Sequence, residues 1–305
     1  MGQQPNIAPM LHLKTEEPRT AYPNITYKGS TFPPKPPILE KGPEKHFADI
    51  TNYNTRDNDI LLCSSQKSGT HWVHEIISML LTQKTEYNSH GPMWELNLEY
   101  LRQPEEVEKL VGPRIFTTHL PFSMLPRKHI EKRNKIVYLN RNLKDRSVSL
   151  YHFLQGKIGV PVWTWEEYFE QTVLHDTVYT GWFNFTKEMT EAVKNSSGHI
   201  FPLMYEDLVL ETKKNITNLA KFLEVPYTEN FINEVIERCS FKNLKGNKRD
   251  VSEVIQPDKK STLFRKGVIG DWKNWFTVSQ NQQLDELYHK EMKDVDIKFK
   301  YEYSQ

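Results

Sequence analysis

Residues 59–82 read DILLCSSQKSGTHWVHEIISMLLT, and the fold class follows from the order of elements in this stretch. Asp59–Ser64 is a short apolar run, as expected for a buried β-strand. Thr70–Thr82 has the spacing of a helix with one apolar face, made of Val73, Ile76, Ile77, Leu80 and Leu81. A strand, a polar turn and a helix in this order predict the first unit of a layered α/β fold.

The turn that joins this strand and helix, Ser65–Trp72, has the composition of an anion-binding loop. A helix start presents unpaired backbone N–H groups and the positive end of the helix dipole. Gly69 lets the backbone approach an anion closely, and Lys67 adds a point charge. Hydroxyl donors follow at Ser68 and Thr70. Ser-Gly-Thr alone would favour an ordinary capped helix, but the lysine and the preceding strand favour a phosphate site.

The same turn does not match the glycine pattern of ATP- and GTP-binding loops, G-x-x-x-x-G-K-[ST]. Lys67 precedes Gly69 instead of following it, and the first glycine of the pattern is absent. The motif therefore does not support a nucleoside triphosphate site with a Mg²⁺ ligand.

Strands and helices continue to alternate after this unit. Further strands are expected at Arg114–His119, Lys135–Asn140 and His199–Tyr205, and further helices at Asp145–Gln155 and Lys213–Leu223. Such alternation predicts an α/β fold with a parallel sheet, whose ligands lie at the carboxyl ends of the strands. A length of 305 residues allows one large domain or two.

The N-terminal part is rich in proline, with nine of the 18 prolines in the first 43 residues. Proline disfavours helix interiors and central strands, so this segment is expected to contain neither. We interpret residues 1–45 as an extended arm that wraps the body or lines a pocket, and residues 46–305 as the functional domain. A frayed tail explains the first dozen residues equally well.

Charge and cysteine content narrow the functional class. The net charge is +1, so no global field attracts the chain to nucleic acid or to an anionic membrane. No apolar run approaches the length of a membrane span. Only Cys63 and Cys239 are present, which excludes a disulfide framework and favours a reducing compartment. The prediction is a cytoplasmic protein with no nucleic-acid or membrane partner.

Six segments together resemble the cytosolic sulfotransferases, in the order and at the spacing of that family. They are Lys67–Thr70 with Trp72, Thr118–Pro121, Arg141–Ser149, Tyr205–Leu208, Ser240–Phe241 and Arg265–Lys273. The resemblance implies one α/β domain around a central parallel sheet, with a P-loop-like phosphosulfate-binding loop. It also implies transfer of a sulfonate group from 3′-phosphoadenosine 5′-phosphosulfate (PAPS) to a hydroxyl of a small, largely apolar acceptor. Adenosine 3′,5′-bisphosphate (PAP) is then the product, and no metal is implied.

The resemblance assigns catalytic roles to three residues. His119 is the expected general base, because a neutral imidazole can take the proton of the attacking hydroxyl. Lys67 is expected beside the oxygen that bridges sulfur and phosphorus, where negative charge grows in the transition state. Ser149 is expected to restrain this lysine until the acceptor binds.

The resemblance also predicts the donor contacts. The 5′ end of the donor is assigned to Lys67, Ser68, Gly69, Thr70, His71 and Trp72. The 3′-phosphate is assigned to Arg141, Ser149, Arg265, Lys266 and Gly267, where arginine can donate two hydrogen bonds at once. The adenine is assigned to a stack between Trp72 and Phe241. Further expected donor contacts are Tyr205, Cys239, Ser240, Leu263 and Phe264.

Candidate walls of the acceptor pocket are aromatic residues near the catalytic segments, namely Trp94, Phe122, Tyr151 and Phe153. Each could equally belong to the core. A pocket built from them would favour an aromatic or alicyclic alcohol.

The chain departs from the family pattern at several positions. Ser65 and Gln66 replace a Tyr-Pro pair before Lys67, and Thr117 replaces the lysine of many phenol-acting members, which leans toward alcohol acceptors. Cys239 replaces a Thr or Ser that often contacts adenine. The family's dimer motif corresponds to Lys273–Gln282, where Gln282 replaces the final Glu, so that a charge pair of the expected homodimer is lost.

Two other functional classes remain open at this stage. A nucleotide kinase would need Mg²⁺ ligands and a Walker-type glycine pattern, and the sequence shows neither. A protein that binds PAPS or PAP without catalysis would fit Ser65, Gln66 and Thr117, whereas Lys67 and His119 favour an enzyme.

Overall fold

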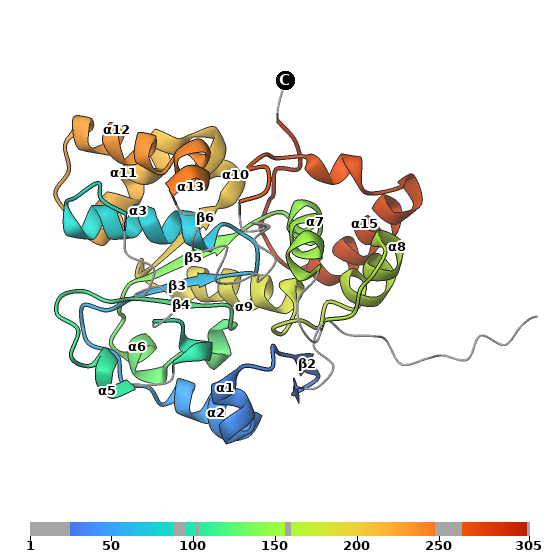
Figure 1. Ribbon diagram of the computed structural model, residues 1–305, viewed down its shortest axis with the longest axis horizontal. Coiled ribbons are helices and arrows are strands. Elements are labelled where there is room, and N and C mark those ends of the chain that lie inside the picture. The colour runs from blue at the N-terminus through green and yellow to red at the C-terminus, as the bar shows by residue number, and fades with distance from the viewer. Residues whose placement is uncertain (1–24, 88–95, 102–103, 156–159, 248–263, 304–305) are drawn as a thin grey trace, which may run out of the picture.

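The computed structural model describes residues 25–87, 96–101, 104–155, 160–247 and 264–303. A four-stranded parallel sheet lies at the centre, in the order β4-β3-β5-β6 (Figure 1). The strands are β3 (Ile60–Ser64), β4 (Ile115–Thr118), β5 (Ile136–Asn140) and β6 (Ile200–Met204). The predicted α/β class with a central parallel sheet is therefore confirmed.

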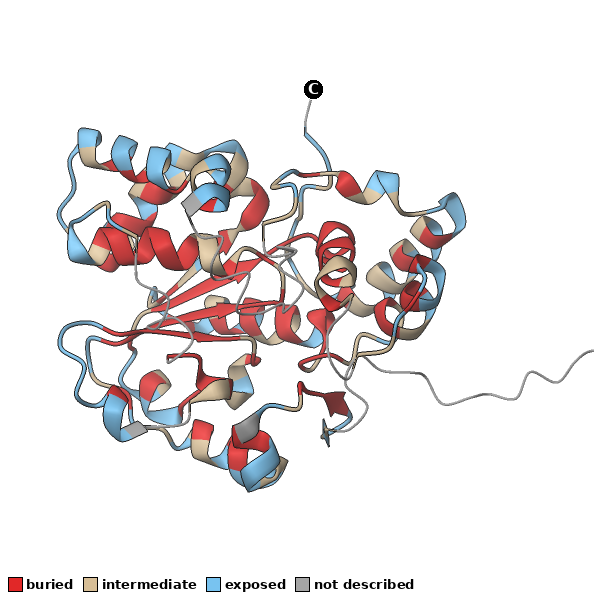
Figure 2. Ribbon diagram, in the orientation of Figure 1, coloured by how far each residue is buried: buried red, intermediate tan, exposed pale blue. Residues whose placement is uncertain are grey.

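The sheet is buried on both faces, as a parallel sheet with helices on each side requires (Figure 2). Side chains alternate along each strand, so Leu61 and Cys63 of β3 join one core and Ile60 and Leu62 join the other. Apolar side chains of helices α3, α11 and α12 cover the face of Ile60 and Leu62. The continuous apolar runs in the sequence reflect this burial on two sides.

Helices connect the strands and also follow the last strand, β6. Those along the first part of the described chain are α1 (Pro36–Lys41), α2 (Pro43–Thr51), α3 (Thr70–Thr82), η1 (Leu98–Tyr100), α5 (Pro104–Val107), η2 (Phe122–Met124), α6 (Arg127–Glu131) and α7 (Leu143–Leu154). Those along the second part are α8 (Trp165–Tyr168), η3 (Phe169–Val173), α9 (Trp182–Asn195), α10 (Tyr205–Leu210), α11 (Thr212–Leu223), α12 (Glu229–Arg238), α13 (Phe241–Asn247), η4 (Asp271–Asn274) and α15 (Val278–Met292).

The elements predicted from periodicity are confirmed, with small shifts at their ends. The predicted helix Thr70–Thr82 is α3, and the predicted strand Arg114–His119 is β4. Helix α7 begins earlier than Asp145 because the side chain of Asn142 accepts a hydrogen bond from the Asp145 N–H and caps the first turn.

The expectation that the first 43 residues contain no regular helix is wrong at α1. This helix begins with Pro36 and Pro37 in its first turn, where a missing N–H leaves no intrahelical bond unmade. Helix α2 also begins with a proline, Pro43. Before α1, β1 (Thr26–Tyr27) and β2 (Ser30–Thr31) form a small antiparallel ribbon. The division of the chain at residue 45 stays a prediction.

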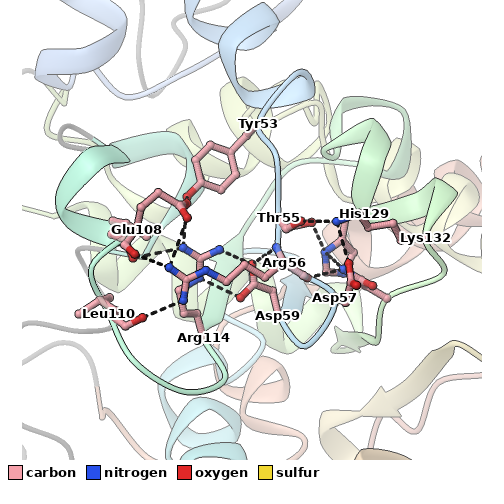
Figure 3. A network of polar contacts seen from close by, with 12 residues as sticks. Tyr53, Thr55, Arg56, Asp57, Asp59, Glu108, Leu110, Arg114, His129 and Lys132 are labelled. Carbon is pink, nitrogen blue, oxygen red and sulfur yellow. Dashed lines mark hydrogen bonds and ion pairs between the residues drawn. The ribbon is translucent and has the colours of Figure 1, made fainter.

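A buried ion pair anchors the sheet at the amino ends of β3 and β4 (Figure 3). Arg114 Nε donates to Asp59 Oδ1 at 2.8 Å, and Arg114 Nη2 donates to Asp59 Oδ2 at 2.5 Å. Glu108 accepts from Arg114 Nη1 at 2.9 Å and from the Tyr53 hydroxyl at 2.9 Å. Because Asp59 and Arg114 each precede a strand, the pair fixes the two strands side by side at the edge opposite the predicted site.

Candidate active site

The carboxyl ends of the four strands bring the predicted site residues to one edge of the sheet. The turn Ser65–Gly69 follows β3, and His119 follows β4. Arg141 follows β5, and Tyr205 follows β6. Neighbouring parallel strands end at the same edge, which is where α/β proteins bind ligands. The strand order places the His119 segment next to the turn Ser65–Gly69, the predicted donor loop, because β4 pairs with β3.

The donor loop is held by polar ties where the family has proline. Ser65 Oγ lies 2.5 Å from Ser68 Oγ and donates to Asn140 Oδ1 at 2.7 Å. The Ser68 N–H donates to the carbonyl of Ser65 at 3.3 Å and closes the turn. Lys67 has a left-handed φ of 64°, and Gly69 has a φ of 102°. These bonds give the turn a defined shape although Ser65 and Gln66 replace Tyr-Pro.

The imidazole of His119 is bonded to the strand that leads into the donor loop. Its Nδ1 lies 2.8 Å from the carbonyl oxygen of Ser64 and 3.4 Å from Ser64 Oγ. A carbonyl oxygen can only accept, so Nδ1 carries the hydrogen and Nε2 of the neutral ring is the proton acceptor. The Ser64 hydroxyl in turn lies 2.7 Å from the hydroxyl of Thr70, at the start of α3. The His119 segment and the start of α3 are thus joined through Ser64.

The surroundings of His119 favour its neutral form. Burial lowers the pKa of His119 to about 4, the bond with the Ser64 carbonyl opposes this shift, and the positive charges of Arg146 and Lys67 add to it. The main-chain N–H of His119 donates to Glu99 Oε1 at 2.6 Å. Burial raises the pKa of this Glu99 carboxyl to about 7. At neutral pH the imidazole can therefore accept a proton.

An aromatic group surrounds the glycine of the donor loop. The ring of Tyr205 packs against Gly69, where an added Cβ would lie 3.1 Å from Tyr205 Cδ2. Trp72 meets the same ring edge-on, with 5.7 Å between ring centroids. The guanidinium of Arg141 stacks over Tyr205 at 4.3 Å from its ring centre. Three residues predicted from different segments, Trp72, Arg141 and Tyr205, are thus adjacent.

A second group of contacts forms between the predicted adenine-stacking turn, Ser240–Phe241, and the glycine-rich segment, Arg265–Lys273. The ring of Phe241 lies so close to Gly267 that an added Cβ would be 2.4 Å from Phe241 Cδ2. Phe264 meets Phe241 edge-on at 6.5 Å. Arg141 links this group to the donor loop, because its Nη2 donates to the carbonyl of Val268 at 3.1 Å and its Nη1 to the carbonyl of Lys67 at 3.4 Å.

The carboxylate of Asp145 attaches the glycine-rich segment to α7. Its Oδ2 accepts from the N–H of Gly270 at 2.8 Å, and its Oδ1 accepts from the N–H of Trp272 at 3.0 Å. Asp145 therefore fixes a segment that lies more than one hundred residues later in the chain.

Arg265 and Lys266, predicted to bind the 3′-phosphate, both pair with Asp271. The Arg265 Nη1 to Asp271 Oδ2 distance is 2.5 Å, and the Lys266 Nζ to Asp271 Oδ1 distance is 2.6 Å. Burial alone would raise the pKa of Asp271, but bonds from Lys266, Asn274 and Arg265 lower it to about 2. Asp271 thus holds both cations within the glycine-rich segment.

The other predicted donor contacts are placed less directly. Ser149 is buried on α7 and His71 is half-buried on α3. Ser240 accepts from the Asn243 N–H at 3.4 Å, at the start of α13. The thiol of Cys239 faces the core, 3.7 Å from the sulfur of Met79. Leu263 lies outside the described residues.

The candidate acceptor walls divide into different environments. Phe153 lies under Lys67, whose Nζ is 4.2 Å from its ring centre. The Tyr151 ring packs with Trp165, Tyr168 and Trp275, and its hydroxyl donates to the Trp163 carbonyl at 3.2 Å. Phe122 is half-buried at the start of η2, and Trp94 lies outside the described residues.

Three residues near His119 were not identified from the sequence: Glu99, Arg146 and Tyr179. Tyr179 meets the His119 ring edge-on at 5.4 Å, and its hydroxyl lies 2.5 Å from that of Tyr100. Glu99 and Tyr179 stand in no recognised motif, and Arg146 lies in the segment Arg141–Ser149 at a position to which the resemblance assigns no role. From the sequence alone, a glutamate in a short 3₁₀ turn and an arginine inside a helix look like ordinary surface residues.

Comparisons with known proteins agree with this arrangement. A family model described as "Sulfotransferase domain" matches residues 57–296. The dog (Canis lupus familiaris) protein sulfotransferase 1B1 is 34% identical over 271 residues, which cover 84% of this chain and 91% of that protein. Human sulfotransferase 1C2 is 33% identical over 279 residues, which cover 86% of this chain and 92% of that protein.

Solved structures share the fold. Mouse sulfotransferase SULT7A1 complexed with PAP has a TM-score of 0.71 at 28% identity, covering 84% of this chain and 92% of that chain. A retinol dehydratase in complex with androsterone and PAP also has a TM-score of 0.71, at 23% identity, covering 86% of this chain and 87% of that chain. The latter likeness concerns the fold.

The chain therefore belongs to the sulfotransferase family, and it is an enzyme that uses PAPS as its sulfonate donor. None of the helices in the described ranges combines the length and apolar character that a membrane span requires. Within the same ranges, no group of three or more His, Cys, Asp or Glu side chains is arranged to hold a metal ion.

Proposed function

We propose that the enzyme transfers the sulfonate group of PAPS to the hydroxyl of a small apolar acceptor, with His119 as general base. The observation that carries the proposal is the bond of 2.8 Å between His119 Nδ1 and the Ser64 carbonyl. It fixes the tautomer in which Nε2 accepts a proton, and it holds the ring beside Ser64, the residue directly before the donor loop.

In the proposed reaction the acceptor oxygen forms a bond with sulfur while the bond from sulfur to the bridging oxygen of PAPS breaks. The hydroxyl proton passes to His119 Nε2, and PAP leaves with the negative charge. Lys67 is suited to offset this charge, because its loop begins at the strand end beside His119.

The donor contacts predicted from the sequence are supported by the short distances between the segments that carry them. Arg141 reaches both the carbonyl of Lys67 and that of Val268, so the loop for the 5′ end and the segment for the 3′ end are held together. Phe241 and Trp72 supply the aromatic faces that an adenine would stack on. Arg265 and Lys266 would add charge for the 3′-phosphate beside Asp271.

For the acceptor we propose an aromatic or alicyclic alcohol. The rings of Phe153 and Tyr179 contact Lys67 and His119, respectively, and support an apolar acceptor at this position. Thr117 is buried and accepts from the Asn97 side-chain amide at 3.2 Å. Position 117 itself supplies no cation to favour a phenolate, because it is a threonine and not the lysine of many phenol-acting members, which supports an alcohol over a phenol.

A sulfonation screen tests this function. The purified chain would be incubated with PAPS and with phenols, sterols, aliphatic alcohols and arylamines, and PAP release would be measured. We expect turnover with at least one alcohol, and unchanged turnover in EDTA. PAP binding without transfer to any acceptor would instead indicate a non-catalytic donor-binding protein, and a loss of turnover in EDTA would point to a metal-dependent enzyme.

We also propose a cytoplasmic location. In addition, we propose that two copies of the chain form a homodimer through the segment Lys273–Gln282. Val278 in this segment is 87% exposed, which supports a contact between copies. Gln282, in place of the family's Glu, donates to Glu286 of its own helix at 2.9 Å. Light scattering of the wild type and of a Val278→Glu variant would test the dimer.

A further inference from the structure

Two arginines hold the two peptide carbonyls on either side of the Lys67 Cα atom. Arg146 Nε donates to the carbonyl of Gln66 at 3.3 Å, and Arg141 Nη1 donates to the carbonyl of Lys67 at 3.4 Å. Both arginines are buried, with 4% and 7% of their surface exposed. Both follow β5, so they tie the donor loop to the neighbouring strand and its helix α7.

The conformation of Lys67 explains why such ties matter. Its φ of 64° lies in the left-handed region, which raises the energy of a non-glycine residue. Such conformations persist where the surroundings over-determine them. Because a trans peptide is planar, the N–H of Lys67 points away from the Gln66 carbonyl. Fixing that carbonyl therefore fixes the direction of the Lys67 N–H.

Arg146 forms a long ion pair with Asp176. Arg146 Nη1 lies 4.0 Å from Asp176 Oδ1. Both carboxylate oxygens of Asp176 also accept from the main-chain N–H groups of Trp182 and Phe183, at 2.8 Å each. The positive charge of Arg146 lowers the pKa of His119, and its effect is larger than that of the Lys67 charge.

We propose that Arg146 is a positioning residue of the sulfonate-transfer site, which holds the Gln66 carbonyl so that Lys67 presents its N–H and its side chain to the donor. The inference rests on the proposed function and deepens it. Ser149 and Phe153 follow Arg146 on the same helix, and the Phe153 ring lies under the Lys67 ammonium. Helix α7 thus positions Lys67 in two ways: Arg146 acts on the backbone beside Lys67, and Phe153 acts on the Lys67 side chain.

A second role follows from the charge. Among the described residues, the positive charges of Lys67 and Arg146 act on the His119 imidazole, the Glu99 carboxyl lies at its main-chain N–H and the Tyr179 ring packs against it. Removing the positive charge of Arg146 makes protonation of the imidazole easier, so the pKa of His119 rises. The acid limb of the pH-rate profile should then move to higher pH.

The test compares Arg146→Met, which removes the charge and the donor, with Arg146→Lys, which keeps the charge. Lys187→Met is the matched control, because Lys187 forms an ion pair with Glu291 at 2.6 Å between α9 and α15. For each variant one measures PAP affinity by calorimetry, kcat and acceptor KM at saturating PAPS, and the pH dependence of kcat/KM.

For Arg146→Met we expect kcat to fall about 10- to 100-fold with acceptor KM within about twofold, as for a lost interaction that acts in the transition state. PAP affinity should fall about 3- to 10-fold, and the acid limb should move up by about 0.5 pH unit. Arg146→Lys should keep the wild-type acid limb and still lose about 3- to 10-fold in kcat, since an ammonium cannot reproduce the guanidinium geometry. Lys187→Met should match the wild type.

Wild-type kcat and a wild-type acid limb in Arg146→Met would overturn the proposal. If that variant does not fold, Arg146→Lys decides, and wild-type kcat in it would refute the positioning role. If the wild type itself transfers sulfonate to no acceptor, the proposed function fails, while the PAP arm still tests the loop. Unchanged PAP affinity in both Arg146 variants would then refute the positioning role by itself.

Discussion

The ammonium of Lys67 lies 4.2 Å from the centre of the Phe153 ring, directly over an aromatic face. A ring face attracts a cation through its quadrupole without neutralising the charge. Lys67 can thus be oriented by Phe153 and keep its full charge for a leaving group.

Replacing Lys67 by Met should lower kcat by about 100-fold or more, because the charge that grows on the leaving oxygen loses its partner. Acceptor KM should change by no more than about twofold if Lys67 acts only in the transition state. Steady-state kinetics at saturating PAPS provide the measurement. A change confined to acceptor KM would show that Lys67 does not serve the leaving group.

His119→Ala should lower kcat by about 10²- to 10⁴-fold, as expected for loss of a general base. PAP affinity should stay within about threefold of the wild type, because the donor is held by other groups. Single-turnover rates and calorimetry measure the two effects. His289→Ala, at an exposed histidine of α15, is the control. Near-normal turnover in His119→Ala would remove this residue as the base.

The pH dependence should reveal the low pKa of His119, which burial lowers to about 4. The base works in its neutral form, so activity is retained above this pKa and lost as pH falls through it. With an alcohol acceptor, kcat/KM at pH 5.5 should stay within about twofold of its value at pH 7.5. An unperturbed histidine would retain only about a tenth at pH 5.5. Circular dichroism at pH 5.5 checks that the chain remains folded.

Gly267→Ala should weaken PAP binding about tenfold, because the new Cβ would displace the Phe241 ring from its present position and with it an adenine-stacking face. Gly198→Ala is a matched control. Gly198 has a φ of 91° against 70° for Gly267, but a Cβ on it would meet no atom within 4 Å. Both variants should lose about 1–2 kcal/mol of stability from the backbone strain. Equal PAP affinities for the two variants would contradict the role of Phe241.

Arg114→Met should lower the free energy of unfolding by about 3–5 kcal/mol, because it leaves the buried carboxylate of Asp59 without its partner. Arg127→Met, at an exposed position of α6, should change it by less than about 0.5 kcal/mol. Urea unfolding gives both values. Because the Arg114 pair lies at the opposite edge of the sheet, kcat of the folded variant should stay near the wild type. A large loss of kcat without destabilisation would contradict this separation.

Much of the fold could be predicted because its signals are local. The apolar run at Ile60–Ser64 and the helical spacing at Thr70–Thr82 each depend on neighbouring residues in the chain. The prediction for the proline-rich segment was wrong at α1, because proline disrupts helix interiors but is favoured in a first turn. The site residues were predicted as separate sequence motifs. Because the carboxyl ends of parallel strands lie at the same edge of a sheet, these motifs were expected to lie close together.

The sequence by itself determined the class of fold and the family, and it predicted an anion-binding turn at Gln66–Trp72, since these signals reside in residue types at fixed spacing. Tertiary structure alone decided that His119 bonds to Ser64, 55 residues earlier, that Asp271 pairs with Arg265 and Lys266, and that Arg146 holds the donor loop. The physical reason is that strand pairing brings distant segments within hydrogen-bond distance, and no local pattern encodes which side chains then face each other.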